Sequence, residues 1–320
     1  MTTLVFVEHH EGEAAKGSLG VLAKAAGLGG DVAAAVVGDN VRGVAEGLGA
    51  HGASRVYVAE DASLAAPLPQ PRVDVLARLV QDEGIDTVLF AASVLAADVA
   101  AALAARLGAG LNWDLVDLES RDGTLVGTTL AFGDTAKVEV GWKSEPRLGL
   151  VRSGAFEPAP ADGGAPELRD VPVEVEEWST QTAMLEQAHE ESSGPSIEDA
   201  DVIVAGGRGL GEAEKFALLE ELAKALGGAV AATRAVVDAG WYPYATQVGQ
   251  TGKNVSPKLY VACGISGAIQ HKVGMQGSGT IVAINKDPNA PIFEYADLAV
   301  VGDLHEIVPK LTELVRQARG

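Results

Sequence analysis

The N-terminal half of the chain alternates short apolar runs with segments of helical periodicity. The apolar runs have the length and composition of buried strands. They are Leu4–Val7, Asp31–Val37, Arg55–Val58 and Thr87–Ala91. The helical segments between and after them are Ala14–Ala26, Val41–Leu48, Arg72–Glu83 and Ala96–Leu107. This alternation predicts a parallel sheet with helices on its faces.

The pattern changes after the fourth predicted helix, where segments rich in valine, threonine and leucine are separated by glycine and aspartate. We predict that Leu125–Phe132, Ala136–Trp142 and Arg147–Val151 form mostly antiparallel strands that close the domain. Residues 157–172 are rich in proline, glycine and alanine, so we predict a loop there. A short strand is expected to follow at Val173–Glu177.

A polar, acidic segment punctuated by glycine and proline, residues 187–196, is predicted to link two domains. The chain is long for one hydrophobic core, so we divide it into residues 1–189 and 190–320. The second part again alternates strands and helices. Its predicted strands are Asp201–Ala205, Gly228–Ala231, Leu259–Ala262 and Thr280–Ile284, and its predicted helices include Glu212–Leu226 and Leu304–Gln317. Both parts are therefore predicted to be α/β domains.

Two turns in the second part have the composition of phosphate-binding turns. The glycine turn Gly206–Gly211 follows a strand, but Glu212 stands where the third glycine of a dinucleotide-binding fingerprint would fall. A nicotinamide dehydrogenase is thereby less favoured, although not excluded. At the second turn, Ser266 is predicted to cap a helix that starts with residues 267–271, which would offer backbone N–H groups to a phosphate. An ordinary turn between a strand and a helix is the alternative.

Composition argues against several classes of function. The 320-residue chain has a formal net charge of −20, so it lacks the basic surface that nucleic-acid binding needs. We see no apolar segment long enough for a membrane helix and no leader pattern, so we expect no membrane insertion and a cytoplasmic location. The single cysteine, Cys263, is expected to be a buried side chain, with a redox thiol as the alternative. No catalytic or metal-binding set stands out, so we expect no substrate turnover by this chain alone.

Several short sequence motifs of the second part, and the order in which they occur, resemble the alpha subunit of electron transfer flavoproteins. They are GGRGLG at Gly206–Gly211, TRAVVDAGW and QVGQTGK between Thr233 and Lys253, GISGAIQH at Gly264–His271, and IVAINKDP at Ile281–Pro288. The first part of the chain resembles the family mainly in its layout and its opening strand.

The resemblance implies a deoxyhypusine-synthase-like α/β fold for the second domain, which would hold one FAD in an extended pose. The residues that match the family's FAD-binding positions are Arg208, Thr233, Arg234, Val248, Gly249, Gln250, Thr251, Ser266, Gly267, Ala268, Ile269, Gln270, His271, Asn285, Asp303 and Leu304. Thr233 stands where a serine is usual in the family, and this substitution keeps the hydroxyl.

Three of these residues are expected to tune the redox properties of the flavin. The resemblance implies that Arg234 lies near the isoalloxazine ring, that the Thr251 hydroxyl reaches flavin N5, and that His271 donates a hydrogen bond near the C2 carbonyl. A fixed guanidinium would stabilise the negative charge that a flavin acquires on reduction. From the residues alone, His271 could instead be an ordinary core residue, and Arg208 could belong to a surface ion pair.

The resemblance also divides the remaining positions between two parts of the cofactor. Ser266 and Gly267 are expected closest to the pyrophosphate, and Gln250 is expected to support the ribityl or phosphate part. Asn285 and Asp303, with its neighbour Leu304, are expected on the adenosine side. Asp303 could equally be the N-cap of the last helix, or serve both purposes.

The family resemblance also implies partners. The chain would form a heterodimer with an electron transfer flavoprotein beta subunit that carries AMP, and its first domain would be a scaffold that docks this subunit. It would carry single electrons from acyl-CoA dehydrogenases of fatty acid β-oxidation, and related flavin dehydrogenases, to a membrane quinone oxidoreductase. Two alternatives stay open: a subunit of an electron-bifurcating, NADH-oxidising flavoprotein, and a non-redox nucleotide-binding interaction protein.

Overall fold

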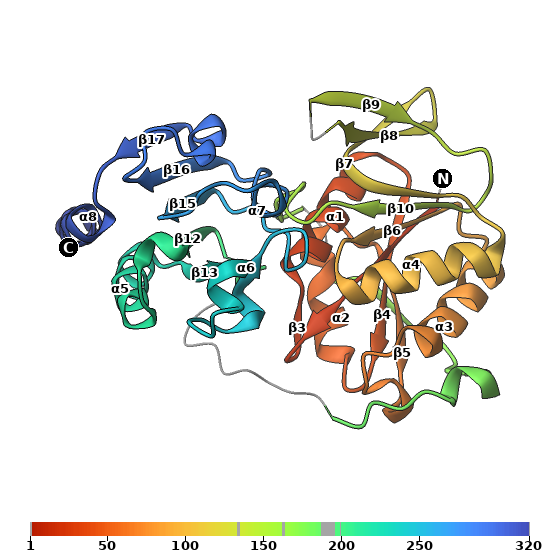
Figure 1. The fold of residues 1–320 in the computed structure, drawn as a ribbon. Coiled ribbons are helices and arrows are strands. Elements are labelled where there is room, and N and C mark those ends of the chain that lie inside the picture. The colour runs from red at the N-terminus through yellow and green to blue at the C-terminus, as the bar shows by residue number, and fades with distance from the viewer. Residues whose placement is uncertain (1, 133–134, 162–163, 187–195, 199, 320) are drawn as a thin grey trace. The chain divides into compact units, whose positions relative to one another are not determined.

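A computed structural model of the chain describes residues 2–132, 135–161, 164–186, 196–198 and 200–319. The chain forms two compact units, residues 1–187 and 188–320, each built around its own large sheet (Figure 1). The predicted two-domain α/β architecture is therefore confirmed. The predicted boundary at residues 189 and 190 lies outside the described residues. None of the helices that the structure describes is long and apolar enough to cross a membrane.

The first unit contains a nine-stranded sheet in the order β11-β5-β4-β1-β6-β10-β7-β8-β9. Its strands are β1 (Thr2–Phe6), β4 (Asp31–Gly38), β5 (Arg55–Glu60), β6 (Thr87–Ala91), β7 (Leu111–Arg121), β8 (Thr124–Ala131), β9 (Ala136–Val140), β10 (Arg147–Val151) and β11 (Glu167–Asp170). Neighbouring strands are parallel from β11 to β7, and β7, β8 and β9 are antiparallel. A short hairpin pairs β2 (His9–His10) with β3 (Glu13–Ala14).

Helices cover both faces of this sheet: α1 (Lys16–Gly27), α2 (Arg42–Gly47), α3 (Pro69–Asp82) and α4 (Val94–Leu107). Successive side chains of a strand point to opposite faces, and the buried residues of β1 follow this rule. Leu4 and Phe6 pack in one cluster with α3 and α4, whereas Val5 packs in the other with α1 and α2. The helices and strands predicted from the apolar alternation are therefore present, with shifts of a few residues at their ends.

The last strand of the predicted antiparallel group is in fact parallel. β10 lies between β6 and β7 and runs parallel to both. Leu148, Leu150 and Val151 are each at most 1% exposed. A strand buried on both faces is typical of the interior of a parallel sheet, so burial rather than alternation explains its apolar run. The antiparallel prediction holds for β8 and β9, whereas β7, which pairs antiparallel with β8, was not predicted.

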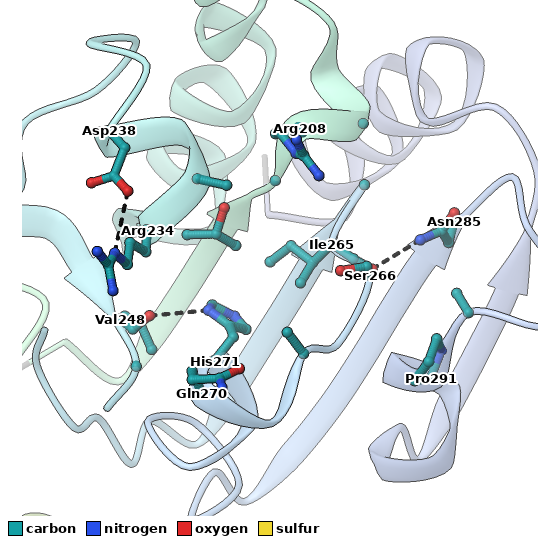
Figure 2. A pocket seen from close by; sticks show the side chains of 18 of the residues that line it. Arg208, Arg234, Asp238, Val248, Ile265, Ser266, Gln270, His271, Asn285 and Pro291 are labelled. Atoms are coloured by element: carbon teal, nitrogen blue, oxygen red, sulfur yellow. Dashed lines mark hydrogen bonds and ion pairs between the residues drawn. The ribbon is translucent and has the colours of Figure 1, made fainter. Parts of the chain in front are cut away.

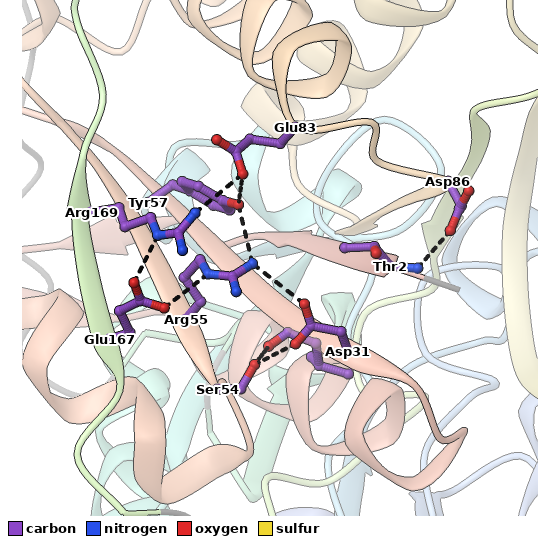
Figure 3. A network of polar contacts seen from close by, with 10 residues as sticks. Thr2, Asp31, Ser54, Arg55, Tyr57, Glu83, Asp86, Glu167 and Arg169 are labelled. Carbon is purple, nitrogen blue, oxygen red and sulfur yellow. Dashed lines mark hydrogen bonds and ion pairs between the residues drawn. The ribbon is translucent and has the colours of Figure 1, made fainter.

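The strand predicted at Val173–Glu177 is wrong, because a strand forms instead at β11, inside the predicted loop. Polar contacts hold β11 to β5 (Figure 3). Arg55 lies 3.2 Å from Glu167, and Arg169 lies 2.9 Å from the same carboxylate. Arg169 and Arg55 together keep the pKa of Glu167 below its usual value. The Arg55–Glu167 pair crosses from β5 to β11, whereas Arg169 and Glu167 lie on the same strand. These charged contacts favour a polar edge strand that apolar periodicity does not reveal.

The second unit contains a six-stranded, fully parallel sheet in the order β14-β13-β12-β15-β16-β17. Its strands are β12 (Val202–Gly206), β13 (Ala229–Thr233), β14 (Gln247–Val248), β15 (Leu259–Cys263), β16 (Thr280–Asn285) and β17 (Leu298–Val301). Its helices are α5 (Phe216–Leu226), α6 (Arg234–Val237), α7 (Ile269–Lys272) and α8 (Leu304–Arg319). Phe216 of α5 and Val308 of α8 pack on one face, and Met275 and Ile292 pack on the other.

Two helices of this unit begin later than predicted. α7 begins at Ile269 with Ala268 at its N-cap position, so Ser266 does not cap it. Gly267 has a φ of +88°, which a helix cannot accommodate, and the chain turns there before the helix starts. α5 begins at Phe216, after a single 3₁₀ turn at Ala213–Lys215. The backbone after β15 is therefore a turn and a one-turn helix.

Candidate functional site

The carboxyl ends of the parallel strands in the second unit border a cavity of about 570 Å³ (Figure 2). Strand order reverses between β12 and β15, and ligands of open α/β sheets bind at such a point. The volume is in the range of cofactor and ligand pockets. The predicted site residues that line it are Arg208, Thr233, Arg234, Val248, Gly249, Gln250, Thr251, Ser266, Ala268, Gln270, His271 and Asn285.

Four predicted residues are not part of this lining: Gly267, Ile269, Asp303 and Leu304. Gly267 makes the tight turn before α7, and the Ile269 side chain is 70% exposed. Leu304 is buried against Gly264. Asp303 is the N-cap of α8, because its carboxylate accepts a hydrogen bond of 2.8 Å from the His305 N–H. The structure thus confirms the capping interpretation of Asp303.

Three glycines bring the ends of β12 and β15 into direct backbone contact. The Gly207 N–H donates to the Cys263 carbonyl and the Gly209 N–H to the Gly264 carbonyl, both at 3.0 Å. A Cβ on Gly207 would lie 2.4 Å from the Gly264 carbonyl oxygen, and one on Gly209 would lie 2.6 Å from the Gly264 Cα. Any side chain at these positions would push the strand ends apart, so the close approach requires glycine.

Arg208 lies between the two glycines of this turn and lines the cavity (Figure 2). It has no ion pair or hydrogen bond with any residue that the structure describes. The alternative of a surface ion pair therefore finds no support in the described part of the chain. A guanidinium without an internal partner, beside a tight backbone turn, is suited to charge-assisted hydrogen bonds with a phosphate.

Arg234, at the start of α6, lines the cavity on the side opposite Ser266, and its guanidinium lies beside Asp238 (Figure 2). Its Nε lies 3.2 Å from the carboxylate of Asp238, one helical turn later, and Asp238 also lines the cavity. The two side chains are 66% and 62% exposed. An exposed pair of this kind is weak, so Asp238 orients the guanidinium without removing its capacity to bind an anion.

The loop after β14 presents the Thr251 hydroxyl to the cavity. The Gln247 side-chain amide nitrogen lies 3.2 Å from Thr251 Oγ1 and can only donate, so the hydroxyl oxygen accepts and its own proton stays available. The Tyr244 hydroxyl donates to the Thr251 carbonyl at 3.0 Å. The Gln250 N–H donates to the Gln270 carbonyl at 2.7 Å. These contacts fix the loop that carries the Thr251 donor.

The turn between β15 and α7 forms the third wall. The Asn285 side chain donates to the Ile265 carbonyl at 2.8 Å and accepts from the Asp287 N–H at 3.0 Å. Asn285 therefore shapes the turn with both ends of its amide. The Ser266 hydroxyl faces the cavity and has no hydrogen-bond partner within the described ranges. Ser266 thus adds a neutral donor near Asn285 at the side of the cavity opposite Arg234 (Figure 2).

His271 lines the cavity but is only 6% exposed. Its Nδ1 lies 3.0 Å from the Val248 carbonyl, and its Nε2 lies 3.0 Å from the Tyr260 hydroxyl. Burial lowers the pKa of His271 to about 4, so the ring is neutral near pH 7. Both ring nitrogens have partners inside the chain. Donation to a flavin carbonyl, expected from the resemblance, would therefore compete with the Val248 bond.

Several residues of the site were missed by the sequence analysis. Asp238 stands four residues after Arg234, and this spacing in a helix is a signal that could have identified the pair. Asp287 lines the cavity at the turn after β16, but its sequence context indicates only a turn. Tyr244 and Gln247 act on Thr251 through contacts that no local pattern predicts.

The arrangement suits an anionic ligand that also carries a polar ring system. Arg208 and the Ser266 hydroxyl are available to a diphosphate, while Arg234 and the Thr251 hydroxyl face another part of the same cavity. FAD carries both kinds of group, so these donors fit it. No cluster of metal-ligating side chains occurs among the residues described. Cys263 is buried, and burial raises its pKa to about 12, so it has the character of a core side chain rather than a reactive thiol.

Comparison with known families and proteins agrees with these features. Residues 3–179 match the electron transfer flavoprotein domain, and residues 196–276 match the electron transfer flavoprotein FAD-binding domain. The chain is 44% identical over 320 residues to an electron transfer flavoprotein subunit alpha of Mycobacterium leprae, with 99% of each chain covered. It is 46% identical to the subunit of the same name from Mycobacterium tuberculosis, again with 99% of each covered. The corresponding Bacillus subtilis protein is 39% identical over 90% of this chain and 88% of its own length.

Proposed function

The chain belongs to the electron transfer flavoprotein alpha-subunit family, and from this premise we propose that its second unit holds one FAD per heterodimer and carries single electrons. The observation that carries the proposal is Arg208, a cation without a partner in the described chain. It faces the same cavity as Arg234 and the Thr251 hydroxyl. When bound, FAD would supply the redox chemistry, and the protein would supply binding, orientation and charge.

Each wall of the cavity has a proposed part in holding the cofactor. Arg208 and Ser266 bind the diphosphate, because both are donors without internal partners in the part of the chain that is described. Arg234 stabilises negative charge on the ring, and Thr251 donates its hydroxyl proton to a ring nitrogen. His271 is the third side chain that tunes the flavin. Asn285 supports the adenosine side by fixing the turn around Ile265.

The remaining lining residues are proposed to contribute mainly through the backbone. They line the same cavity as Arg234 and Ser266, and they are Thr233, Val248, Gly249, Gln250, Ala268 and Gln270. Gly249 has a φ of +139°, and a Cβ there would lie 2.7 Å from the Gln270 carbonyl oxygen, so glycine lets the two loops meet. Gly267, Ile269, Asp303 and Leu304 support the binding site through the fold.

We further propose the partners that the family relationship suggests. The first unit, with a boundary near residue 190, would be a scaffold that docks an electron transfer flavoprotein beta subunit carrying AMP. The electron donors would be acyl-CoA dehydrogenases and related flavin dehydrogenases, and the acceptor a membrane quinone oxidoreductase. The protein would act in the cytoplasm as a carrier without substrate turnover of its own. NADH oxidation by a second flavin on the partner would instead indicate an electron-bifurcating complex.

A binding experiment tests the proposal. The full-length chain is co-expressed with its beta-type subunit, stripped of flavin and titrated with FAD by fluorescence quenching. We expect one FAD per heterodimer and a dissociation constant about 10–100-fold higher for Arg208→Ala, since a charge-assisted hydrogen bond contributes about 1.5–3 kcal/mol. Arg316→Ala is the matched control, because Arg316 pairs with Glu221 on the surface of α8 and α5. Equal affinities for wild type and Arg208→Ala would contradict the role of Arg208, and absence of FAD binding by wild type would overturn the proposed function.

A further inference from the structure

A buried chain of hydrogen bonds links the wall of the cavity, at Val248 and His271, to Tyr260 in the core behind it. The Tyr260 hydroxyl is 3.0 Å from His271 Nε2, and His271 Nδ1 is 3.0 Å from the Val248 carbonyl. Tyr260 is 0% exposed, Val248 1% and His271 6%. The three residues come from β15, β14 and α7. These hydrogen bonds therefore connect the core of the sheet to the loop that carries Thr251.

The chemistry of the two ends fixes the positions of the protons. A carbonyl oxygen can only accept, so His271 Nδ1 carries a proton and donates it to Val248. In the neutral ring Nε2 is then an acceptor, and the Tyr260 hydroxyl donates to it. The Tyr260 hydroxyl makes no other hydrogen bond to the residues described. Protonation of Nε2 would therefore turn Tyr260 into an acceptor and leave its own buried O–H unpaired, which is unfavourable.

The charged groups near His271 do not offset the preference for a neutral ring protonated at Nδ1. Arg208, Arg234, Asp238 and Asp287 line the same cavity, but none is a hydrogen-bond partner of the imidazole. The neighbouring Lys272 ammonium lies 3.9 Å from the carboxylate of Glu294 and 4.0 Å from the centre of the Tyr295 ring. Among the described residues that pack on the imidazole from β14 and β15, the titratable one is Tyr260, and burial raises its pKa well above the usual value.

We propose that Tyr260 is a positioning residue that holds His271 as the neutral, Nδ1-protonated tautomer, so that no proton is taken up at His271 when the flavin is reduced. The second half of this statement rests on the proposed function. An electron that arrives from a reduced partner flavoprotein adds one negative charge to the cavity. No proton moves to His271 to compensate it, and Arg234 is left to balance that charge.

The same hydrogen bonds link the tautomer of His271 to the position of the loop that forms one wall of the cavity. His271 Nδ1 holds the Val248 carbonyl, and the next two residues run directly into the loop held by the bond between Gln250 N–H and the Gln270 carbonyl. An Nε2-protonated ring would release Val248, and the loop with Thr251 would lose an anchor. Tyr260 thus positions Thr251 through His271 without touching the cavity itself.

Nuclear magnetic resonance of the ring nitrogens tests the tautomer without any flavin. The full-length chain is labelled with ¹⁵N-histidine, and the signal of His271 among the six histidines is assigned with a His271→Gln variant. We expect a protonated Nδ1, an unprotonated Nε2 and no titration between pH 5.5 and 8. Wild-type protein is sufficient for this test. A ring protonated at Nε2, or a His271 titration midpoint near the ordinary pKa of about 6.5, would overturn the proposal.

Tyr260→Phe removes the donor to Nε2 and keeps the ring that packs in the core. With the titration extended below pH 5.5, so that the wild-type midpoint is also reached, we expect the His271 midpoint to rise by about one pH unit, the size of one neutral hydrogen bond. Tyr242→Phe is the matched control, because Tyr242 stacks on Phe216 and donates to Glu220, away from His271. The same midpoint in Tyr260→Phe and wild type would refute the role of Tyr260.

A second readout separates this inference from the proposed function. In the flavin-loaded heterodimer, the one-electron potential of wild type is expected to be independent of pH between 6 and 8. In Tyr260→Phe it is expected to become pH-dependent as the pH falls below this range, at values where the wild-type potential stays constant. A wild-type potential that follows the titration of His271 would contradict the proposal. If the heterodimer binds no FAD, the proposed function fails, whereas the ring-nitrogen measurement still decides the tautomer.

Discussion

Replacement of Gly264 by alanine tests whether the contact between β12 and β15 shapes the cavity. Gly264 has a φ of +63°, and a Cβ there would lie 2.8 Å from the Gly209 Cα and 2.8 Å from Leu304 Cδ2. The left-handed conformation costs an alanine about 1 kcal/mol. A methyl group forced against backbone costs about 1–3 kcal/mol more. We therefore expect Gly264→Ala to lower the free energy of unfolding by about 2–4 kcal/mol.

Gly240→Ala is the matched control for this substitution. Gly240 has a φ of +72°, but no atom lies within 4 Å of a Cβ built there, so the variant carries the conformational cost alone. Urea unfolding of the full-length chain gives the stability of each variant, and FAD titration of the heterodimer gives its affinity. Gly264→Ala should weaken FAD binding as well, because the turn that carries Arg208 must move. Equal losses of stability in the two variants, with unchanged FAD affinity, would refute the reasoning.

The other predictions concern the charge of Arg234, the hydroxyl group of Thr251 and the protonation of His271. Arg234→Ala is expected to lower the one-electron potential of bound FAD by up to about 170 mV. The reason is that a guanidinium about 4 Å from new negative charge contributes about 4 kcal/mol at an effective dielectric constant of about 20. An unchanged potential would contradict this prediction. Thr251→Ala is expected to change the flavin spectrum and potential, whereas Thr251→Ser should preserve both. If the two variants behave alike, the hydroxyl is not the relevant group. Burial lowers the pKa of His271 from 6.5 to about 4, so the unfolded chain binds a proton more readily between these values, and stability is expected to fall as pH drops through this window. His271→Gln should reduce the slope of the urea midpoint between pH 7 and 5, and identical slopes would count against this.

The sheet architecture could be predicted because apolar spacing reports burial directly. The alternation in β1 places Leu4 and Phe6 on one face and Val5 on the other, as the structure has them. Periodicity does not report pairing partners, which is why β10 was expected to be antiparallel. It also misses mainly polar strands: Glu167–Asp170 pairs with β5, and the ion pair between Arg55 and Glu167 joins residues far apart in the sequence.

The candidate site could be predicted only where short sequence motifs match those of a known family. Arg208, Arg234 and Thr251 line one cavity, as the resemblance implied. The start of α7 could not be predicted, because the conformation of Gly267 depends on its contact with Ile292, whose backbone N would lie 2.3 Å from a Cβ at that position. The partners of His271 are likewise set by tertiary contacts and by no local pattern.

The most direct test of the central claim is the visible absorption spectrum of the co-purified heterodimer during stepwise anaerobic reduction. The account predicts flavin bands from one FAD per heterodimer, with a distinct spectrum that accumulates after about one electron and disappears after the second. A heterodimer that stays colourless and cannot be reconstituted with FAD would contradict it. Two flavins per heterodimer, one of them reduced directly by NADH, would contradict the carrier function and favour electron bifurcation.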